Sequence, residues 1–292
     1  MTNKFSDLIK LLRINQWIKN GFILFPLIFS GQLYQIHRLA GSWLTFVGFC
    51  FISSSVYIIN DFMDAKNDRL HPQKSQRPLA QQKFSTLEVF LMIFIIMTTG
   101  FFLCWKADAM IFFMAILYVV LHLIYNFYTK QVVLLDVIFI AAGFQIRVWA
   151  GSFAAQVLPS VWLQLCVFLL ALFLGFTKRR HEIASLKNHA VEHRSVLAHY
   201  TTYLLDQIII ICSTLTIVFY GLYAISPEII SRLGNHNLAY SMSFVIYGIF
   251  RYLYLVHVKK SGGDPGELIF SDKPLMMNIF LWIIYIIYLL YP

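Results

Sequence analysis

The chain has 292 residues, of which 59% are hydrophobic and only 13% are charged. With a mean hydropathy of +0.69 it has too little polar material to coat a soluble globule of this size, so the composition excludes an ordinary soluble domain and indicates an integral membrane protein. The four cysteines lie in apolar runs without CxxC or Cys/His spacing, which predicts neither a disulfide framework nor a zinc site.

Residues 1–20 are predicted to form an amphipathic helix that lies on the membrane surface. The segment is basic but has no compact apolar core followed by a small-residue cleavage site, so it is not read as a cleaved signal peptide. At helical spacing the apolar stripe consists of Phe5, Leu8, Ile9, Leu12 and Trp17. The cations that can meet lipid head groups are Lys4, Lys10, Arg13 and Lys19.

Apolar runs long enough to cross a bilayer, at about 20 residues each, fill most of the remaining chain. The predicted spans are 21–36, 40–59, 86–105, 109–128, 133–151, 160–177, 203–224, 238–257 and 275–291. The first is short and contains Pro26, so we expect it to be tilted, kinked or packed deep in the protein. The fold class is therefore all-α, a membrane bundle of about nine helices in a single domain over residues 1–292.

The lysines and arginines are distributed unevenly about these spans. If the N-terminus is cytoplasmic, 19 of the 23 lie on cytoplasmic segments, 3 lie on outer loops, and Arg147 lies inside a span. The positive-inside rule therefore predicts a cytoplasmic N-terminus in the cell membrane. This bias also explains most of the net charge of +9, so no nucleic-acid partner is required.

Acidic residues gather directly behind the second span. If that span continues as a helix past Ile59, Asp61, Asp64 and Asp68 fall within an arc of about 60°, and Asn60 lies about 40° beyond Asp64. Carboxylates this close require a positive charge between them, and Mg²⁺ with its preference for oxygen ligands suits the set. The competing interpretation is a solvated helix end whose acids pair with nearby cations, namely Lys66, Arg69 and Lys74.

Polar residues on the other predicted cytoplasmic segments are candidates for binding substrate anions, because arginine forks and lysine point charges are common anion ligands. The candidates are Lys19, Asn20, Tyr125, Lys130, Lys178, Arg179, Arg180 and Glu182. Taken singly, each cation is more often a topology determinant. The pair Asp136 and Arg147 lies inside one span, where pairing between helices and a functional role are both open.

These residues resemble the UbiA-type prenyltransferase superfamily. Its signature, an Asn-Asp pair with two further aspartates, is met by Asn60, Asp61, Asp64 and Asp68, and "RINQWIKN", "DRLHPQKSQRPLA" and "FRYLYLV" extend the likeness over the whole chain. The chain resembles the decaprenyl-phosphate phosphoribosyltransferase branch more closely, through "NDFMDAKNDRLHP", "GFTKRRHE" and "GGDPGELIFSDKP". The resemblance implies a UbiA-like bundle and a site in which the three aspartates and Asn60 hold Mg²⁺.

The resemblance also implies a reaction: transfer of 5-phosphoribose from phosphoribosyl diphosphate to a polyprenyl phosphate, for cell-wall biosynthesis, at the cytoplasmic face. Prenyltransferases of this superfamily carry a second Asp-rich motif after the sixth span, where this chain has the basic "TKRRHEIASLKNHAVEHR". A basic loop opposite one acidic motif suits a single metal diphosphate plus further phosphates, which favours the phosphoribosyl branch. The implied partners are the two substrates and the membrane, and a homo-oligomer is compatible with them.

Two other functions remain open. The first is an intramembrane prenyltransferase that moves a prenyl group from a prenyl diphosphate to an aromatic or other lipophilic acceptor. The second is a transporter with a cation site, which would place ionisable groups near the bilayer midplane and show inverted repeats. Most of the charge in this sequence lies at one predicted surface, which disfavours the transporter.

Overall fold

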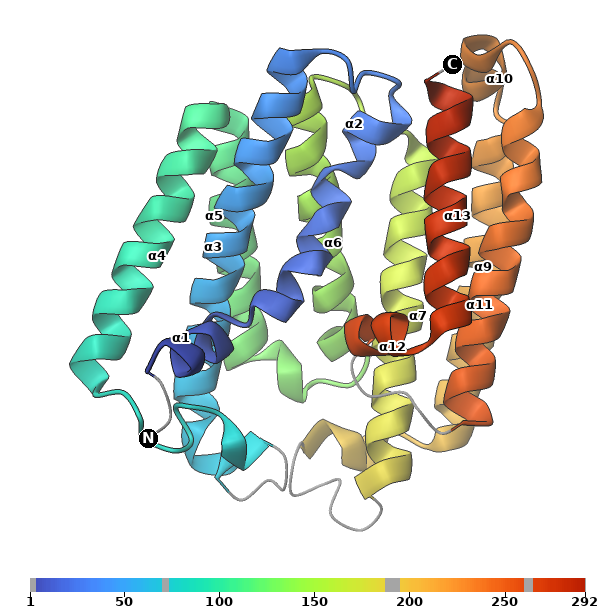
Figure 1. Ribbon diagram of the computed structural model, residues 1–292. Helices are drawn as coiled ribbons and strands as arrows, with labels where there is room; N and C mark the ends of the chain where they lie inside the picture. Colours follow the sequence, from blue (N-terminus) through green and yellow to red (C-terminus); the bar gives the residue numbers. More distant parts are fainter. Residues whose placement is uncertain (1–3, 70–73, 187–194, 260–264, 292) are drawn as a thin grey trace. The chain divides into compact units, whose positions relative to one another are not determined.

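The computed structural model describes residues 4–69, 74–186, 195–259 and 265–291. Every regular element in these ranges is a helix, which confirms the all-α prediction (Figure 1). The α-helices are α1 (Lys4–Leu12), α2 (Phe25–Phe29), α3 (Ile36–Asp68), α4 (Thr86–Ala107), α5 (Ala109–Phe127), α6 (Leu135–Ala155), α7 (Val161–Leu186), α9 (Thr202–Ala224), α10 (Pro227–Leu233), α11 (Met242–His257), α12 (Pro265–Ser271) and α13 (Lys273–Leu290). Short 3₁₀ helices are η1 (Ile14–Ile23), η2 (Lys74–Gln76), η3 (Thr129–Gln131), η5 (Ser195–His199) and η6 (Asn237–Ser241).

Eight helices in the described ranges are long and apolar enough to cross a membrane. They correspond to the predicted spans from 40–59 onward. The predicted span at 21–36 is wrong, because η1 ends at Ile23 and α2 covers only Phe25–Phe29. Pro26 cannot donate a backbone hydrogen bond, and Gly31 adopts a φ of 73° that ends helical geometry. The expectation that this segment packs deep is met by Ile23 and Leu27, which are fully buried.

The predicted helix over residues 1–20 is also interrupted. α1 ends at Leu12, and Arg13 has a left-handed backbone conformation (φ 51°, ψ 47°) before η1 begins. A non-glycine residue in this region is strained and persists only where other contacts hold it. Arg13 therefore lies at a break between two helical segments, α1 and η1.

The chain packs as two compact units. The first contains residues 1–27, 33–129 and 146–157, and the second contains 28–32, 130–145 and 158–292. In the first unit α3, α4 and α5 pack against one another (Figure 1), and the close approach of α3 and α4 occurs at two glycines. A Cβ at Gly100 would lie 2.9 Å from the carbonyl oxygen of Gly48, so only glycine allows this spacing. The core beneath is formed by residues such as Phe49, Ile52 and Tyr118.

The second unit is built on the pairing of α7 with α9, with α11 and α13 packed alongside (Figure 1). Its buried core includes Phe173, Leu205, Ile209 and Tyr252. All four cysteines of the chain are free and buried, as the sequence predicts.

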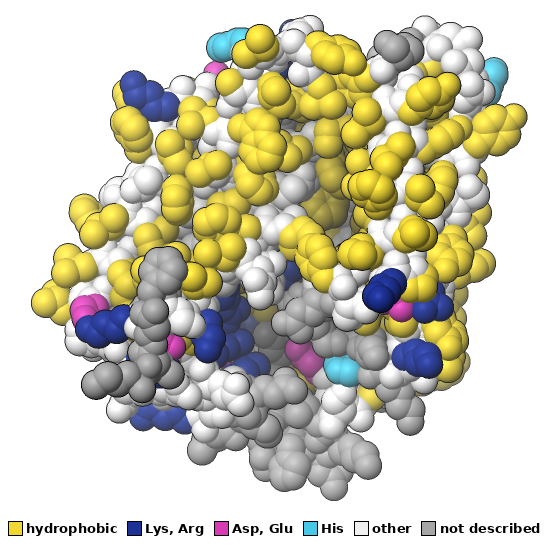
Figure 2. All heavy atoms as spheres, viewed as in Figure 1, with side chains coloured by type: hydrophobic (Ala, Val, Ile, Leu, Met, Phe, Trp, Pro, Cys, Tyr) yellow, Lys and Arg dark blue, Asp and Glu magenta, His cyan; other side chains and the backbone are white. Residues whose placement is uncertain are grey.

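Large hydrophobic side chains cover the outer faces of the spanning helices. On α4 the exposed ones include Leu87, Phe90, Phe94, Ile95, Phe102 and Trp105, and on α13 they include Met277, Phe280 and Tyr288. Figure 2 shows hydrophobic side chains over the helices of each unit. Such faces are unfavourable in water and suit lipid. Together with the eight candidate spans they make this an integral membrane protein.

Candidate functional site

The acidic motif lies at the C-terminal end of α3. This helix extends through Asp68 without a break, which confirms the helical continuation on which the predicted acidic face depends. Asp61 and Asp68 are 4% and 5% exposed, whereas Asp64 and Asn60 are half-buried. The motif therefore presents two deeply placed carboxylates on one face of the helix.

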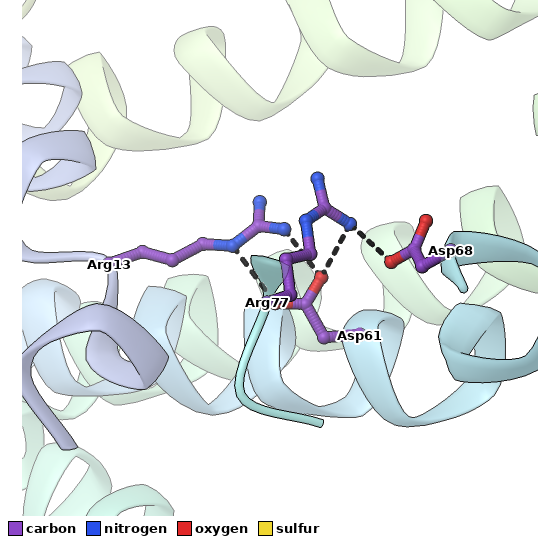
Figure 3. A network of polar contacts seen from close by, with 4 residues as sticks. All are labelled: Arg13, Asp61, Asp68 and Arg77. Carbon is purple, nitrogen blue, oxygen red and sulfur yellow. Dashed lines mark hydrogen bonds and ion pairs between the residues drawn. The ribbon is translucent and has the colours of Figure 1, made fainter. Parts of the chain in front are cut away.

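Two arginines from outside α3 bind these carboxylates (Figure 3). Arg13 forms a fork on Asp61: its Nε donates to Oδ2 at 3.0 Å and its Nη2 donates to Oδ1. Nη1 of Arg77 bridges the two acids, at 3.0 Å from Oδ1 of Asp61 and 2.6 Å from Oδ2 of Asp68. The cluster of Arg13, Asp61, Asp68 and Arg77 has no net formal charge, and this neutrality allows the two carboxylates to be buried together.

Neither arginine is among the partners that the competing interpretation gave these acids, which were Lys66, Arg69 and Lys74. Arg69 instead donates from Nε to the carbonyl of Ala80 at 3.2 Å. Arg13 precedes Asp61 by 48 residues in the chain, and Arg77 follows it by 16. No short-range pattern reveals such pairs. The available signal was that both arginines lie in the segments "RINQWIKN" and "DRLHPQKSQRPLA", which carry the family resemblance.

The N-terminal segment is fastened along α3 at successive turns, which places Arg13. Ser54 donates to the carbonyl of Leu12 at 2.7 Å, and the indole of Trp17 donates to the Ser54 hydroxyl at 2.9 Å. The Arg13 guanidinium also lies 5.2 Å from the ring centre of Tyr57, within cation–π range. These contacts over-determine the backbone at Arg13 and hold its strained conformation.

A second ion pair ties α1 to the loop that follows the motif. Nζ of Lys83 lies 2.8 Å from Oδ1 of Asp7, whose carboxylate is nearly buried. Further along that loop, Ser85 and Glu88 form a capping box that starts α4. The loop carrying Arg77 is thus held at one end by α3 and at the other by α1 and α4.

The donor set fits a magnesium ion in part. In the described ranges no three His, Cys, Asp or Glu side chains converge as metal ligands do. The set of Asn60, Asp61, Asp64 and Asp68 therefore stays a prediction. Asp61 and Asp68 do converge, because both accept from the same nitrogen of Arg77. One or two carboxylates are what Mg²⁺ commonly uses when substrate phosphates supply further oxygens.

Among the predicted anion ligands of the first unit, Asn20 is fully buried and belongs to a polar cluster between helices. Its amide donates to Ser53 at 3.1 Å, and its oxygen accepts from Nε of Arg147 at 2.7 Å. Arg147 also donates to the hydroxyl of Tyr118 at 2.7 Å and lies over that ring. Asn20 therefore contacts α3 and α6 through its side chain, and Arg147 pairs with residues of other helices, which is one of the two roles left open by the sequence. Lys19 and Tyr125 are half-buried.

The remaining candidates belong to the second unit. Arg179 is 2% exposed and its Nε lies 2.6 Å from Oδ2 of Asp136, which is completely buried. The hydroxyl of Tyr200 donates to the other oxygen of Asp136 at 2.8 Å and accepts from the backbone N–H of Leu134. Burial, together with this hydrogen bond to Asp136, raises the pKa of Tyr200. Arg179 is thus part of a buried polar network with Asp136 and Tyr200.

The segment 178–182 is helical and not part of a loop, because α7 continues to Leu186. The structure brings Glu182 and Arg179 together, with Oε2 at 3.0 Å from Nη1, one helical turn apart. Arg180 pairs with Asp206 of α9. Lys178 and Lys130 are half-buried. Residues 187–194 of the predicted basic loop lie outside the described ranges.

Arg251, another cation of the second unit, joins two of the sequence motifs that carry the family resemblance. Arg251 of "FRYLYLV" forms a fork on Asp272 of "SDKP", with distances of 3.1 Å and 2.9 Å. The same carboxylate accepts from the backbone N–H of Leu275 and caps α13. The Arg251 hydrogen bonds lower the pKa of Asp272. The fork links α11 to the start of α13, and Gly262–Asp264 of the neighbouring motif lie outside the described ranges.

Comparisons with known proteins agree on the family. The model of the UbiA prenyltransferase family matches residues 24–289. Decaprenyl-phosphate phosphoribosyltransferase from Mycolicibacterium smegmatis is 30% identical over 290 residues, covering 96% of this chain and 91% of that protein. Its counterpart from Corynebacterium glutamicum is 28% identical, covering 99% and 88%.

Solved structures show the same fold. A UbiA homolog from Archaeoglobus fulgidus, solved with GPP and Mg²⁺ bound, superposes with a TM-score of 0.73 at 17% identity, covering 98% of this chain and 100% of that one. Digeranylgeranylglyceryl phosphate synthase gives a TM-score of 0.66 at 20% identity, with 98% of each chain covered. Since the family model spans most of the sequence and near full-length relatives agree with it, the chain belongs to the UbiA prenyltransferase family.

Proposed function

We propose that the protein transfers 5-phosphoribose from phosphoribosyl diphosphate to a polyprenyl phosphate, with Mg²⁺ bound at the end of α3. The observation that carries the proposal is the convergence of Asp61 and Asp68 on one cationic nitrogen. It is supported by the near full-length likeness to proteins named decaprenyl-phosphate phosphoribosyltransferase.

The reaction breaks the bond between C1 of ribose and the diphosphate oxygen, and forms a bond from C1 to an oxygen of the acceptor phosphate. The carbon that is attacked carries oxocarbenium-like positive charge, and negative charge grows on the departing diphosphate. A magnesium ion, when bound, supplies Lewis-acid stabilisation of those oxygens and orients them. The acceptor phosphate is already anionic at neutral pH, so the reaction needs no dedicated general base.

The acidic residues of α3 have distinct parts in this proposal. Asp61 and Asp68 would hold the metal from a buried face, where a low dielectric would strengthen their attraction for it. Asp64 and Asn60 are half-buried on the same helix and would supply further oxygen ligands to the metal. Lys19, Lys130, Lys178 and Arg180 stay predictions as phosphate ligands. Asn20 and Arg179 stay predictions as well; in the structure Asn20 accepts a hydrogen bond from Arg147, and Arg179 pairs with Asp136.

We further propose that the acidic end of α3 faces the cytoplasm. The excess of lysine and arginine on segments that share a side with the N-terminus supports this orientation. A soluble phosphorylated sugar donor would reach the site from that side, while the acceptor would remain in the membrane because its prenyl chain is insoluble in water.

The experiment that tests the function uses purified protein with Mg²⁺, labelled phosphoribosyl diphosphate and polyprenyl phosphate. We expect label in the lipid fraction and release of pyrophosphate, with loss of both when EDTA replaces Mg²⁺. A parallel reaction with geranyl diphosphate and a lipophilic aromatic acceptor examines the prenyltransferase alternative. Folded protein that labels only in the second reaction would refute the proposal.

Asp64→Asn is the cleanest variant of the motif, because Asp64 is half-buried, whereas Asp61 and Asp68 are almost fully buried and form ion pairs with Arg13 and Arg77. We expect transfer to fall by at least about 100-fold while the thermal unfolding midpoint stays near that of the wild type. The matched control is Asp108→Asn at the exposed N-cap of α5, where asparagine caps equally well. Equal activities of the two variants would remove Asp64 from the site.

A further inference from the structure

Arg77 lies where a bound cation would lie. Its Nη1 contacts both Asp61 and Asp68, the two carboxylates that converge in the motif. A divalent metal between these oxygens would be within a few ångströms of the guanidinium, where like charges repel by several kcal/mol even at an effective dielectric of about 20. The metal and the bridging guanidinium therefore exclude each other.

We propose that Arg77 is a built-in counter-ion that neutralises the acidic motif without metal and must leave Asp61 and Asp68 when the metal binds. The inference rests on the proposed role of Mg²⁺ and does not depend on which group is transferred. It assigns Arg77 a positioning role: it keeps two buried carboxylates paired while the site is empty of metal, and it sets the metal concentration at which the site fills.

Arg77, and not Arg13, is the arginine that can move. Arg13 holds Asp61 with two nitrogens, stacks over Tyr57 and belongs to a segment fastened along α3. Arg77 bonds to the acids through one nitrogen and its side chain is 27% exposed, so a path to solvent is open. Figure 3 shows it reaching the face of α3 from a loop, while Asp68 and Asp61 lie on the helix itself.

The backbone at Arg77 confines this motion to the side chain. Its N–H donates to the carbonyl of Lys74 at 2.9 Å, and its carbonyl accepts from the N–H of Gln81 at 3.0 Å. Pro78 follows immediately and restricts the backbone of Arg77 further. Release of the bridge therefore requires rotation about side-chain bonds and leaves the loop in place.

The cost of displacement appears as weaker metal binding. If the bridged arrangement holds about 90% of the metal-free molecules, the apparent metal affinity is about tenfold lower than that of the open motif. Removing the bridge should recover this factor. Substitution of an exposed arginine that does not contact these carboxylates should change the metal affinity only slightly, because solvent screens the charge of its guanidinium.

The first experiment measures binding of Mn²⁺ alone by electron paramagnetic resonance, on the full chain in detergent. We expect Arg77→Gln to bind Mn²⁺ about tenfold more tightly than the wild type. The matched control is Arg69→Gln, whose guanidinium bonds to the carbonyl of Ala80 and whose affinity should change less than twofold. Equal affinities of the two variants would overturn the inference.

The second experiment uses the wild-type protein, and so remains decisive if Arg77→Gln does not fold. Phenylglyoxal modification of individual arginines is followed by mass spectrometry with and without Mg²⁺. We expect Mg²⁺ to raise the modification rate of Arg77 several-fold and to leave that of Arg13 unchanged. An unchanged rate at Arg77 would show that metal does not displace it, whether or not the protein transfers phosphoribose. Displacement is thereby separated from simple removal of a repelling charge.

Discussion

Asp136→Asn should destabilise the protein strongly, because it removes the fully buried charge partner of a buried guanidinium. Asp136 is completely buried, its ion pair with Arg179 is 2.6 Å long, and the Arg179 side chain is 3% exposed. Breaking such a pair by removing one member costs about 3–5 kcal/mol. Glu182 remains beside Arg179 at 3.0 Å but is itself partly exposed, so it recovers only part of the loss.

The assay is reversible unfolding by sodium dodecyl sulfate in mixed micelles, followed by tryptophan fluorescence, at pH 7. Asp206→Asn is the matched control, since it removes the carboxylate of another Arg pair whose side chains are 19% and 30% exposed. Such a solvent-accessible pair contributes at most about 1 kcal/mol. We therefore expect a difference of at least about 2 kcal/mol between the two variants.

A double variant separates loss of the pair from loss of the site. Asp136→Asn combined with Arg179→Met removes both charges, so it should be more stable than Asp136→Asn alone by about 2 kcal/mol or more. If the free energy of unfolding of Asp136→Asn is within about 1 kcal/mol of the wild-type value, the network does not stabilise this unit as its burial implies. That result would favour the predicted role of Arg179 in phosphate binding.

Two further predictions concern packing and charge. Gly151→Ala should destabilise the first unit by about 3 kcal/mol or more, because the new Cβ would lie 2.0 Å from the carbonyl oxygen of Ile23. The control is Gly21→Ala, whose Cβ meets nothing within 4 Å, and this variant should be neutral in the same unfolding assay. Asp272→Asn keeps the helix cap but loses the Arg251 fork. Folding lowers the pKa of Asp272, so the stability that this carboxylate contributes is present above about pH 3.9 and is lost as the pH falls through the lower pKa of the folded state. Below about pH 5, the free energy of unfolding of Asp272→Asn should therefore depend less on pH than that of the wild type.

Most of the fold could be predicted because hydrophobic length and helical periodicity determine where a chain crosses a membrane. The failures occur where backbone conformation overrides apolar length. The run 21–36 is apolar enough to suggest a span, yet Pro26 and the positive φ of Gly31 interrupt it. The left-handed backbone of Arg13 divides the predicted surface helix for the same local reason. A hydropathy pattern contains no term for either effect.

The acidic face of α3 was accessible to sequence reasoning because it depends only on spacing within one helix. The cationic partners of this face were not accessible to sequence reasoning, because their placement depends on backbone conformation far from Asp61 in the chain. Arg13 has a left-handed backbone, and Arg77 lies in a turn just before Pro78. Local spacing likewise could not distinguish Arg179 from Arg180, although one is locked inside the second unit and the other is partly exposed. The side of α7 on which each guanidinium lies decides its partner.

The distribution of the aspartates' partners has a consequence for the order in which the first unit assembles. Asp61 accepts from Arg13, which precedes it in the chain, and from Arg77, which follows it. Asp7 of α1 pairs with Lys83, which follows Arg77 in the same loop. A carboxylate buried at the end of an apolar helix is unfavourable until its partner arrives. The end of α3 therefore becomes stable only when the N-terminal segment and the Arg77 loop have both docked, so these three segments should form and open as one cooperative element.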